Sequence, residues 1–233
     1  MRSRVTPVTQ RIPPGLSPTD VAHLRARAKR VLRDRIRQTR RTISPASVQR
    51  KSAQIVQHLL QLEALQAADG IGLYWPMLQR AEVDLRPLDR SLRKLGKRLY
   101  YPFMRAKEGT SQAGESVVYD TGFARVEQIE DLVESRGFFQ PGASAPAAPR
   151  GAIQLILAPA LAASSDLHRL GYGLGYYDST LPDYCPPAQV IVVVFDFQLV
   201  AELPVEPHDF KCHAVLTESR VFAASSEPAP SNG

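Results

Sequence analysis

The chain has 233 residues, of which 44% are hydrophobic and 22% charged, and its net charge is +6. A chain of this length and composition can bury a full globular core. No apolar run reaches membrane-spanning length, and the arginine-rich N-terminus lacks the apolar segment of a secretory signal. Two cysteines, Cys185 and Cys212, are too few for a disulfide framework or a zinc site. We therefore expect a cytoplasmic protein with free thiols and no membrane partner.

The positive charge is concentrated near the N-terminus. Residues 1–51 hold 14 Lys or Arg against 2 Asp or Glu, a net charge of +12, whereas residues 52–233 hold 15 against 21, a net charge of −6. Such asymmetry is typical of a nucleic-acid-binding arm, and equally of a helix that meets polyphosphate. The aromatic residues of a stacking platform are missing from residues 1–51, which argues against nucleic acid as the partner.

The first predicted elements are helical. Residues 1–18 are proline-rich, and we expect a disordered extension. Ser17 or Thr19 can cap a helix that runs to about Thr42, and Ser44 followed by Pro45 predicts the start of a second helix. The apolar stripe expected for the first helix consists of Val21, Leu24, Ala28, Val31 and Leu32.

Strands and helices then alternate. Gly70 opens a predicted strand, Ile71 to Trp75, and leucines from Leu85 to Leu95 predict a helix that Gly96 ends. Further predicted elements are a strand from Arg98 to Tyr101 ended by Pro102, a short strand from Val117 to Tyr119, a helix from Val126 to Glu134 and an exposed loop from Ala143 to Pro149.

The C-terminal third reads mainly as strands. These run from Ile153 to Ala158, from Gln189 to Phe195, from Leu199 to Leu203 and from Ala214 to Leu216, before a tail from Ala224 that we expect to be disordered. Alternating strands and helices predict one α/β domain over residues 19–223, with a largely parallel sheet and an N-terminal helical pair. Ligands of such sheets bind where the strands end.

One loop stands out chemically. Residues 169–178 read Arg-Leu-Gly-Tyr-Gly-Leu-Gly-Tyr-Tyr-Asp, and a short helical turn is expected from Asp178 to Leu181. Alternate glycines expose backbone N–H groups to an anion, Arg169 suits phosphate, and the Asp178 carboxylate suits Mg²⁺. The loop matches neither of the two best-known phosphate-binding glycine motifs. The alternative is a surface turn whose tyrosines pack on the core.

A second candidate lies on the first helix. Lys29 and Arg33 are four residues apart, so both side chains project from one face of a helix. The pair could grip two phosphate groups. The alternative is an ordinary solvated basic face.

The ten-residue loop resembles that of the 5-formyltetrahydrofolate cyclo-ligase family. Other segments in the family's order also match, over roughly residues 25–220: Lys29 to Arg33, Glu82-Val83-Asp84, Pro207-His208-Asp209, and Val215-Leu216-Thr217-Glu218. The resemblance implies a three-layer α/β/α fold. It also implies a ligase that converts 5-formyltetrahydrofolate and ATP into 5,10-methenyltetrahydrofolate, ADP and phosphate with Mg²⁺. We expect the protein to be a monomer.

The resemblance also implies roles for residues. Arg169 and Lys29 would act in catalysis, Trp75 and Glu82 would bind folate, and Asp178 would bind Mg²⁺. The residues implied to bind ATP are Lys29, Arg30, Val31, Leu32, Arg33, Arg169, Leu170, Gly171, Tyr172, Gly173, Leu174, Gly175, Tyr176 and Tyr177. The structural alternatives are a core tryptophan, a surface glutamate and an N-cap aspartate at position 178.

The sequence departs from the family pattern in two places. Ala163 and Ser164 stand where the family often has Phe-Asp, and His213 stands where a second metal-linked aspartate is expected, so water or Asp209 would replace that ligand. The spacing of His168, His208 and His213 fits no zinc site. Two other functions compete: a degenerate family member that binds RNA through its basic helix, and a sugar-phosphate enzyme on a similar fold.

Overall fold

The computed structural model describes residues 17–106, 118–135 and 137–223. The expected extension as far as residue 16, the expected tail and Val117 lie outside these ranges. Ser17 caps helix α1 (Pro18–Arg41), because its hydroxyl accepts a hydrogen bond from the backbone of Asp20 and the Asp20 carboxylate accepts one in return. Helix α2 (Pro45–Gln61) starts at the predicted cap Ser44, so the N-terminal helical pair is present.

The described residues form a seven-stranded central sheet, and five adjacent strands of it are parallel. In spatial order the strands are β12 (Val221–Ala223), β11 (Ala214–Leu216), β9 (Gln189–Val193), β6 (Leu155–Pro159), β1 (Gly70–Gly72), β2 (Arg98–Ala106) and β3 (Tyr119–Arg125). The two edge strands, β12 and β3, are antiparallel to their neighbours. From β1 the chain proceeds to β2 on one side, and from β6 to β9 on the other. The strand order therefore reverses between β1 and β6, which is where open α/β sheets bind ligands.

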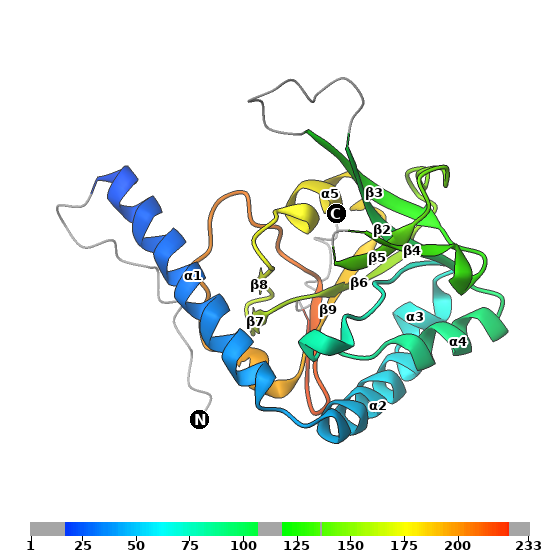
Figure 1. Ribbon diagram of the computed structural model, residues 1–233, viewed down its shortest axis with the longest axis horizontal. Helices are drawn as coiled ribbons and strands as arrows, with labels where there is room; N and C mark the ends of the chain where they lie inside the picture. The colour runs from blue at the N-terminus through cyan, green and yellow to red at the C-terminus, as the bar shows by residue number, and fades with distance from the viewer. Residues whose placement is uncertain (1–16, 107–117, 136, 224–233) are drawn as a thin grey trace, which may run out of the picture.

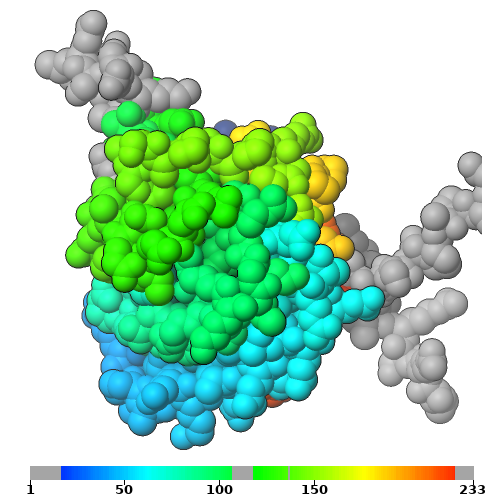
Figure 2. Space-filling view, turned by 90° about the vertical axis from the view of Figure 1, so that its right-hand side faces the viewer, coloured from blue at the N-terminus to red at the C-terminus, as the bar shows by residue number. Residues whose placement is uncertain are grey.

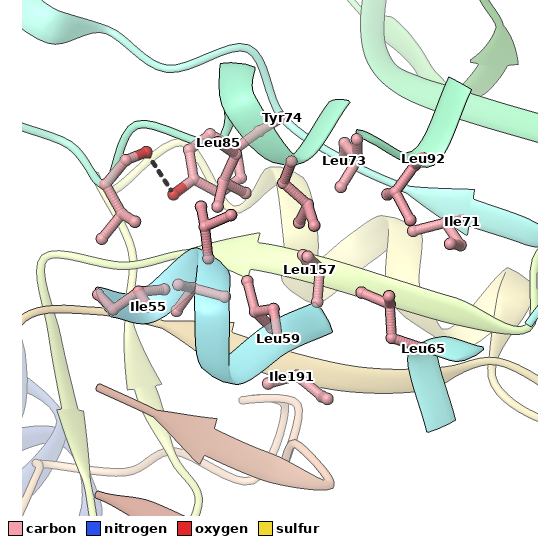
Figure 3. Packing of buried hydrophobic residues seen from close by; sticks show 14 of the residues in the cluster. Ile55, Leu59, Leu65, Ile71, Leu73, Tyr74, Leu85, Leu92, Leu157 and Ile191 are labelled. Carbon is pink, nitrogen blue, oxygen red and sulfur yellow. Dashed lines mark hydrogen bonds between the residues drawn. The ribbon is translucent and has the colours of Figure 1, made fainter. Parts of the chain in front are cut away.

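Helices cover both faces of this sheet. Helices α2, α3 (Glu63–Ala67) and α4 (Arg86–Lys94) pack against one face, where Figure 3 shows Ile55 and Leu59 beside Leu157 and Ile191. Helix α5 (Tyr176–Tyr184) packs against the other face through Leu181. This arrangement confirms the predicted three-layer α/β/α fold. Figure 2 views the side of the molecule formed by α2 to α4 and by the β3–β5 segment.

The predicted apolar stripe of α1 is wrong. Leu24 and Val31 are 52% and 59% exposed, and only Leu32 of the five stripe residues packs against a described apolar cluster. The inward face instead carries Lys29, Arg33, Ile36 and Arg40, which recur at helical spacing. The polar members of this face find carboxylate and carbonyl partners in the body of the protein, so charge as well as apolar area directs the docking of α1.

Small sheets and turns complete the fold. Helix α1 lies beside a three-stranded sheet made of β10 (Leu199–Val200), β7 (Ala162–Ser164) and β8 (Arg169–Leu170), as Figure 1 shows. A hairpin of β4 (Leu132–Ser135) and β5 (Phe138–Pro141) lies next to β2. Three 3₁₀ turns are η1 (Leu78–Arg80), η2 (Ile129–Asp131) and η3 (Asp196–Gln198).

Two other expectations need correction. The helix predicted from Val126 to Glu134 is a 3₁₀ turn followed by β4, because Val126 bonds to the backbone of Leu99 and Leu132 pairs with Pro141. Pro102 does not end β2. The parallel partner β1 pairs only as far as Tyr100, so the missing N–H of Pro102 interrupts no ladder there. None of the described helices is long and apolar enough to cross a membrane.

Candidate active site

A pocket of about 380 Å³ opens where β1 and β6 end. Its walls come from segments far apart in the sequence: α1, the segment after β1, the end of β6, the glycine loop, and the turn at residues 206–209. The pocket therefore lies at the strand ends where the strand order reverses, as the rule for α/β sheets predicts.

The glycine loop forms one wall of the pocket and ends in the N-terminus of α5. Gly175, with φ +68°, is the residue that caps this helix, and Gly173 has φ +103°. A side chain is strained at such angles, which explains glycine at both positions. A Cβ atom at Gly173 would also lie 3.6 Å from the Arg33 guanidinium. A helix N-terminus reached through a glycine turn presents backbone N–H groups and a positive dipole end to an anion.

Arg169 and Asp178 hold the two ends of this loop together. Arg169 is 7% exposed, and its Nη2 donates a hydrogen bond to Oδ1 of Asp178 at 2.7 Å. The same oxygen accepts a hydrogen bond from the backbone N–H of Phe210 at 3.3 Å. The Asp178 carboxylate is therefore oriented by a cation and by the segment that follows Asp209, with Asp178 and Asp209 both on the pocket wall.

Lys29 and Arg33 reach the pocket from α1. Lys29 Nζ contacts Glu206 at 2.5 Å and Asp209 at 2.8 Å, and Arg33 Nε donates to the carbonyl of Gly171 at 2.9 Å. Burial would raise the pKa of Asp209, but the hydrogen bonds from Lys29 and from the backbone of Glu206 outweigh it, so this pKa lies below its usual value. These contacts hold both cations at the pocket wall rather than on a solvated face.

The other residues named from the family motif lie differently. Arg30 and Val31 are exposed and do not line the pocket. Leu32 and Leu170 belong to the apolar cluster between α1 and the three-stranded sheet. The pocket wall does include Arg169, Gly171, Tyr172, Gly173, Leu174, Gly175, Tyr176 and Tyr177.

Glu82 and Trp75 also line the pocket. Glu82 is only 1% exposed, and its Oε2 accepts a hydrogen bond from the backbone N–H of Met77 at 2.8 Å, while Oε1 accepts one from the hydroxyl of Tyr172. Burial raises the pKa of Glu82, although these hydrogen bonds oppose the shift. Trp75 lines the same pocket and packs with its ring against Tyr101. Glu82 is thus not a surface glutamate.

Sequence reasoning missed three parts of this site. The first is Arg40, which is 6% exposed and donates to the Tyr172 hydroxyl at 2.6 Å. The second is Tyr172 itself as a side-chain partner of Glu82. The third is an apolar wall that includes Met104, Phe138 and Phe139. Arg40 lies in an arginine-rich segment, so the sequence does not single it out. Its spacing of seven residues from Arg33 nevertheless places both residues on one face of the helix.

The two departures from the family pattern lie away from the pocket. Ser164 is fully buried, and its hydroxyl donates to Asp166. His213 accepts a hydrogen bond from the backbone of Val190 through Nδ1, and burial lowers its pKa. Asp209, by contrast, does line the pocket. Besides Glu82, the described carboxylates that line the pocket are Asp178, Glu206 and Asp209, and carboxylate oxygens suit Mg²⁺.

The remaining histidines and cysteines that the sequence singled out have the following partners. His168 contacts Asp166, and His208 is the one histidine grouped with carboxylates within reach of a common ion among the described residues. Lys29 already lies against the two carboxylates of that group, Glu206 and Asp209. Both cysteines are free, with Cys212 buried and Cys185 partly buried.

Comparison with known proteins supports these observations. Residues 25–218 match the 5-formyltetrahydrofolate cyclo-ligase family. A 5-formyltetrahydrofolate cyclo-ligase from Mycolicibacterium smegmatis is 47% identical over 79 residues, which cover 34% of this chain and 41% of that protein. The enzyme of the same name from Escherichia coli K12 is 28% identical over 190 residues, covering 80% and 98% of the two chains.

Solved structures agree in fold. The NMR structure of Aquifex aeolicus 5,10-methenyltetrahydrofolate synthetase superposes with a TM-score of 0.71 and 26% identity, covering 85% of this chain and 94% of that one. A 5,10-methenyltetrahydrofolate synthetase from Mycoplasma pneumoniae, at 21% identity and a TM-score of 0.61, shares the fold over 82% of this chain and 98% of its own. This chain is a ligase and belongs to the 5-formyltetrahydrofolate cyclo-ligase family.

Proposed function

We propose that this protein converts 5-formyltetrahydrofolate and ATP into 5,10-methenyltetrahydrofolate, ADP and phosphate, with Mg²⁺. The observation that carries the proposal is that two chemically different groups of residues line a single pocket. One group is the glycine loop with Lys29, Arg33 and Arg169, and the other is the buried Glu82 carboxylate with Trp75. A polyphosphate fits the first group, and a flat heterocycle with N–H donors fits the second.

The reaction needs the amide oxygen of the formyl group to leave, and this oxygen is a poor leaving group. In the proposed route it attacks the γ-phosphorus of ATP, and the bond from that phosphorus to the bridging oxygen of ADP breaks. The N10 amine then attacks the formyl carbon, its proton is lost, and the carbon–oxygen bond breaks to release phosphate. Phosphoryl transfer of this kind depends mainly on positioning and on cations around the moving charge.

The glycine-loop group of residues supplies that positioning. The N-terminus of α5 would accept the phosphates on its N–H groups, Arg169 would stabilise charge on the transferred group, and Lys29 would close the cradle from α1. Asp178 and Asp209 would hold Mg²⁺, which neutralises charge on the phosphates when it is bound. Because Lys29 lies against Asp209, the lysine and a bound Mg²⁺ would share one carboxylate cluster.

The other group of residues would bind the folate. The Glu82 carboxylate would accept hydrogen bonds from the amino and ring N–H groups of the pterin, and Trp75 would cover the ring face. All of these residues come from one chain, so we expect the monomer to be active. The free thiols suit the reducing cytoplasm, where we expect the protein to act.

The direct test mixes the purified protein with 5-formyltetrahydrofolate, Mg²⁺ and ATP. Methenyltetrahydrofolate has a new conjugated amidinium group, so its formation is followed by the near-ultraviolet absorbance that the substrate lacks. An increase that requires all three components supports the proposal. Folded protein that gives no increase contradicts it and favours the RNA-binding alternative, which predicts RNA affinity that falls steeply with salt.

A further inference from the structure

A buried row of three side chains runs from α1 to Glu82: Tyr172 and Glu82 line the pocket, and Arg40 lies behind them. Nη1 of Arg40 lies 2.6 Å from the Tyr172 hydroxyl oxygen, and that hydroxyl bonds to Oε1 of Glu82. Arg40 and Glu82 are 6% and 1% exposed. The two formal charges of the row are therefore shielded from water, with the phenol between them.

The chemistry of the partners fixes the direction of these hydrogen bonds. A guanidinium only donates, so the Tyr172 oxygen must accept from Arg40. The hydroxyl proton is then left for Glu82, which accepts as a carboxylate. Arg40 thus makes Tyr172 an obligatory donor, and the phenol transmits the attraction of the guanidinium to the carboxylate.

Arg40 is itself held in place. Its Nη2 donates to the carbonyl of Ala160 at 2.7 Å, and its guanidinium lies 5.8 Å from the centre of the Tyr172 ring. The guanidinium of Arg80 lies 5.7 Å from the same ring centre. Two guanidinium groups therefore contact the ring of Tyr172 and help to hold it in place.

The row leaves a defined acceptor edge on Glu82. A carboxylate has about four acceptor positions, two on each oxygen. One position on Oε1 is used by Tyr172 and one on Oε2 by the backbone of Met77, so each oxygen retains one. A pair of parallel acceptors of this kind matches a ligand edge with two adjacent N–H donors, such as the amino and ring N–H groups of a pterin.

We propose that Arg40 and Tyr172 are positioning residues that keep Glu82 ionised and orient its free acceptors toward the pterin. This inference rests on the proposed function and assigns Tyr172 two roles: its backbone serves the phosphate-binding group and its hydroxyl serves the folate-binding group. The titratable groups that interact with Glu82 come from five segments, namely Arg40 from α1, Tyr74 after β1, Arg80 from η1, Tyr172 from the loop and Tyr177 from α5.

The test is Tyr172→Phe, which removes only the hydroxyl. Because one hydrogen bond to a charged group is lost, KM for 5-formyltetrahydrofolate should rise about ten- to a hundredfold, while KM for ATP stays within about twofold. The acid limb of the folate kcat/KM profile should also move to higher pH, since the Tyr172 hydrogen bond lowers the pKa of Glu82. Tryptophan fluorescence gives a second readout of folate binding, because Trp75 is the chain's single tryptophan and lines the pocket.

A matched control exists in the core. The Tyr101 hydroxyl donates to buried Asp89 at 2.5 Å, and Arg93 contacts the same carboxylate, but Tyr101 and Asp89 do not line the pocket. Tyr101→Phe therefore removes the same kind of hydrogen bond outside the pocket, and it keeps the ring that packs against Trp75. It should lower the stability of the protein and leave KM for both substrates unchanged.

The role of Arg40 is tested in protein that already carries Tyr172→Phe. If Arg40 acts through the hydroxyl, then Arg40→Met added to Tyr172→Phe should change KM for folate by less than about twofold, although it lowers stability. If Tyr172→Phe leaves KM for 5-formyltetrahydrofolate unchanged, or raises KM for 5-formyltetrahydrofolate and KM for ATP equally, the inference is overturned and the proposed function still stands. Wild-type protein that neither binds nor converts 5-formyltetrahydrofolate overturns the proposed function, and the inference with it.

Discussion

Arg169 and Asp178 stand at opposite ends of the glycine loop and are joined by a hydrogen bond of 2.7 Å. The bond closes the loop into a ring of ten residues whose N–H groups lead into the N-terminus of α5. The Asp178 carboxylate is therefore held in one orientation, with the Arg169 guanidinium beside it.

The first prediction concerns this aspartate as a metal ligand. Asp178→Asn keeps the shape of the side chain and an oxygen that accepts from Arg169, but removes the negative charge. The Mg²⁺ concentration that gives half-maximal turnover should rise at least about tenfold, since a charged contact is worth about 1.5–3 kcal/mol. A titration of activity with Mg²⁺ measures it. An unchanged Mg²⁺ requirement would remove Asp178 from the metal site.

The second prediction concerns Lys29 and ATP. Lys29→Ala should raise KM for ATP or lower turnover by about a hundredfold, if the lost charged contact is worth about 3 kcal/mol. Arg35→Ala on the same helix is the matched control, because Arg35 is exposed and does not line the pocket. Steady-state kinetics should separate the two variants. Equal ATP kinetics in both would mean that Lys29 only anchors Glu206 and Asp209.

The third prediction is a pH dependence of stability at Asp209. Its pKa in the folded protein lies below the usual 3.8, so the unfolded chain binds this proton more readily. The contribution of ionised Asp209 to the free energy of unfolding is therefore present above about pH 4. It is lost as the pH falls through the lower pKa that Asp209 has in the folded protein. Urea unfolding of wild type and Asp209→Asn should show a free-energy difference that shrinks on acidification below about pH 4. A difference that does not change with pH would contradict the pairing with Lys29.

The fourth prediction concerns the backbone of the loop. Gly173→Ala places a side chain at φ +103°, at a cost of about 1–2 kcal/mol, with its Cβ in van der Waals contact with the Arg33 guanidinium. KM for ATP should rise as the loop rearranges. Gly96→Ala is the control, since Gly96 has φ +73° after α4 and open space around it, so it should cost stability and leave ATP binding alone. If Gly173→Ala binds ATP normally, the loop tolerates distortion and is not the cradle.

The sequence predicted the architecture where local pattern and global fold agree. β11 has the predicted bounds, and Gly96 has the left-handed angle expected of a residue that ends a helix. The predictions failed where tertiary contacts outweigh local pattern. Val126 to Glu134 has helical spacing, yet Leu132 gains its burial by pairing with β5.

The site divides in the same way. Lys29, Arg33, Glu82, Trp75 and the loop motif could be named from local spacing and resemblance. All of them except Leu170 of the loop line one pocket. Arg40 could not, because its importance comes from a partner 132 positions away. The apolar residues of the β4–β5 hairpin escaped notice for the same reason, since only the folded chain brings Phe138 to the pocket.

Helix α1 has a consequence beyond its charge. It holds Lys29 against Asp209 and Arg40 against the Tyr172 hydroxyl, and the two are separated by eleven residues, or about 16 Å of helix rise. The length of the helix thus sets the spacing of these two cations. One residue inserted between them would turn one end by about 100° relative to the other, so this stretch should tolerate substitution on its outer face but no change in length.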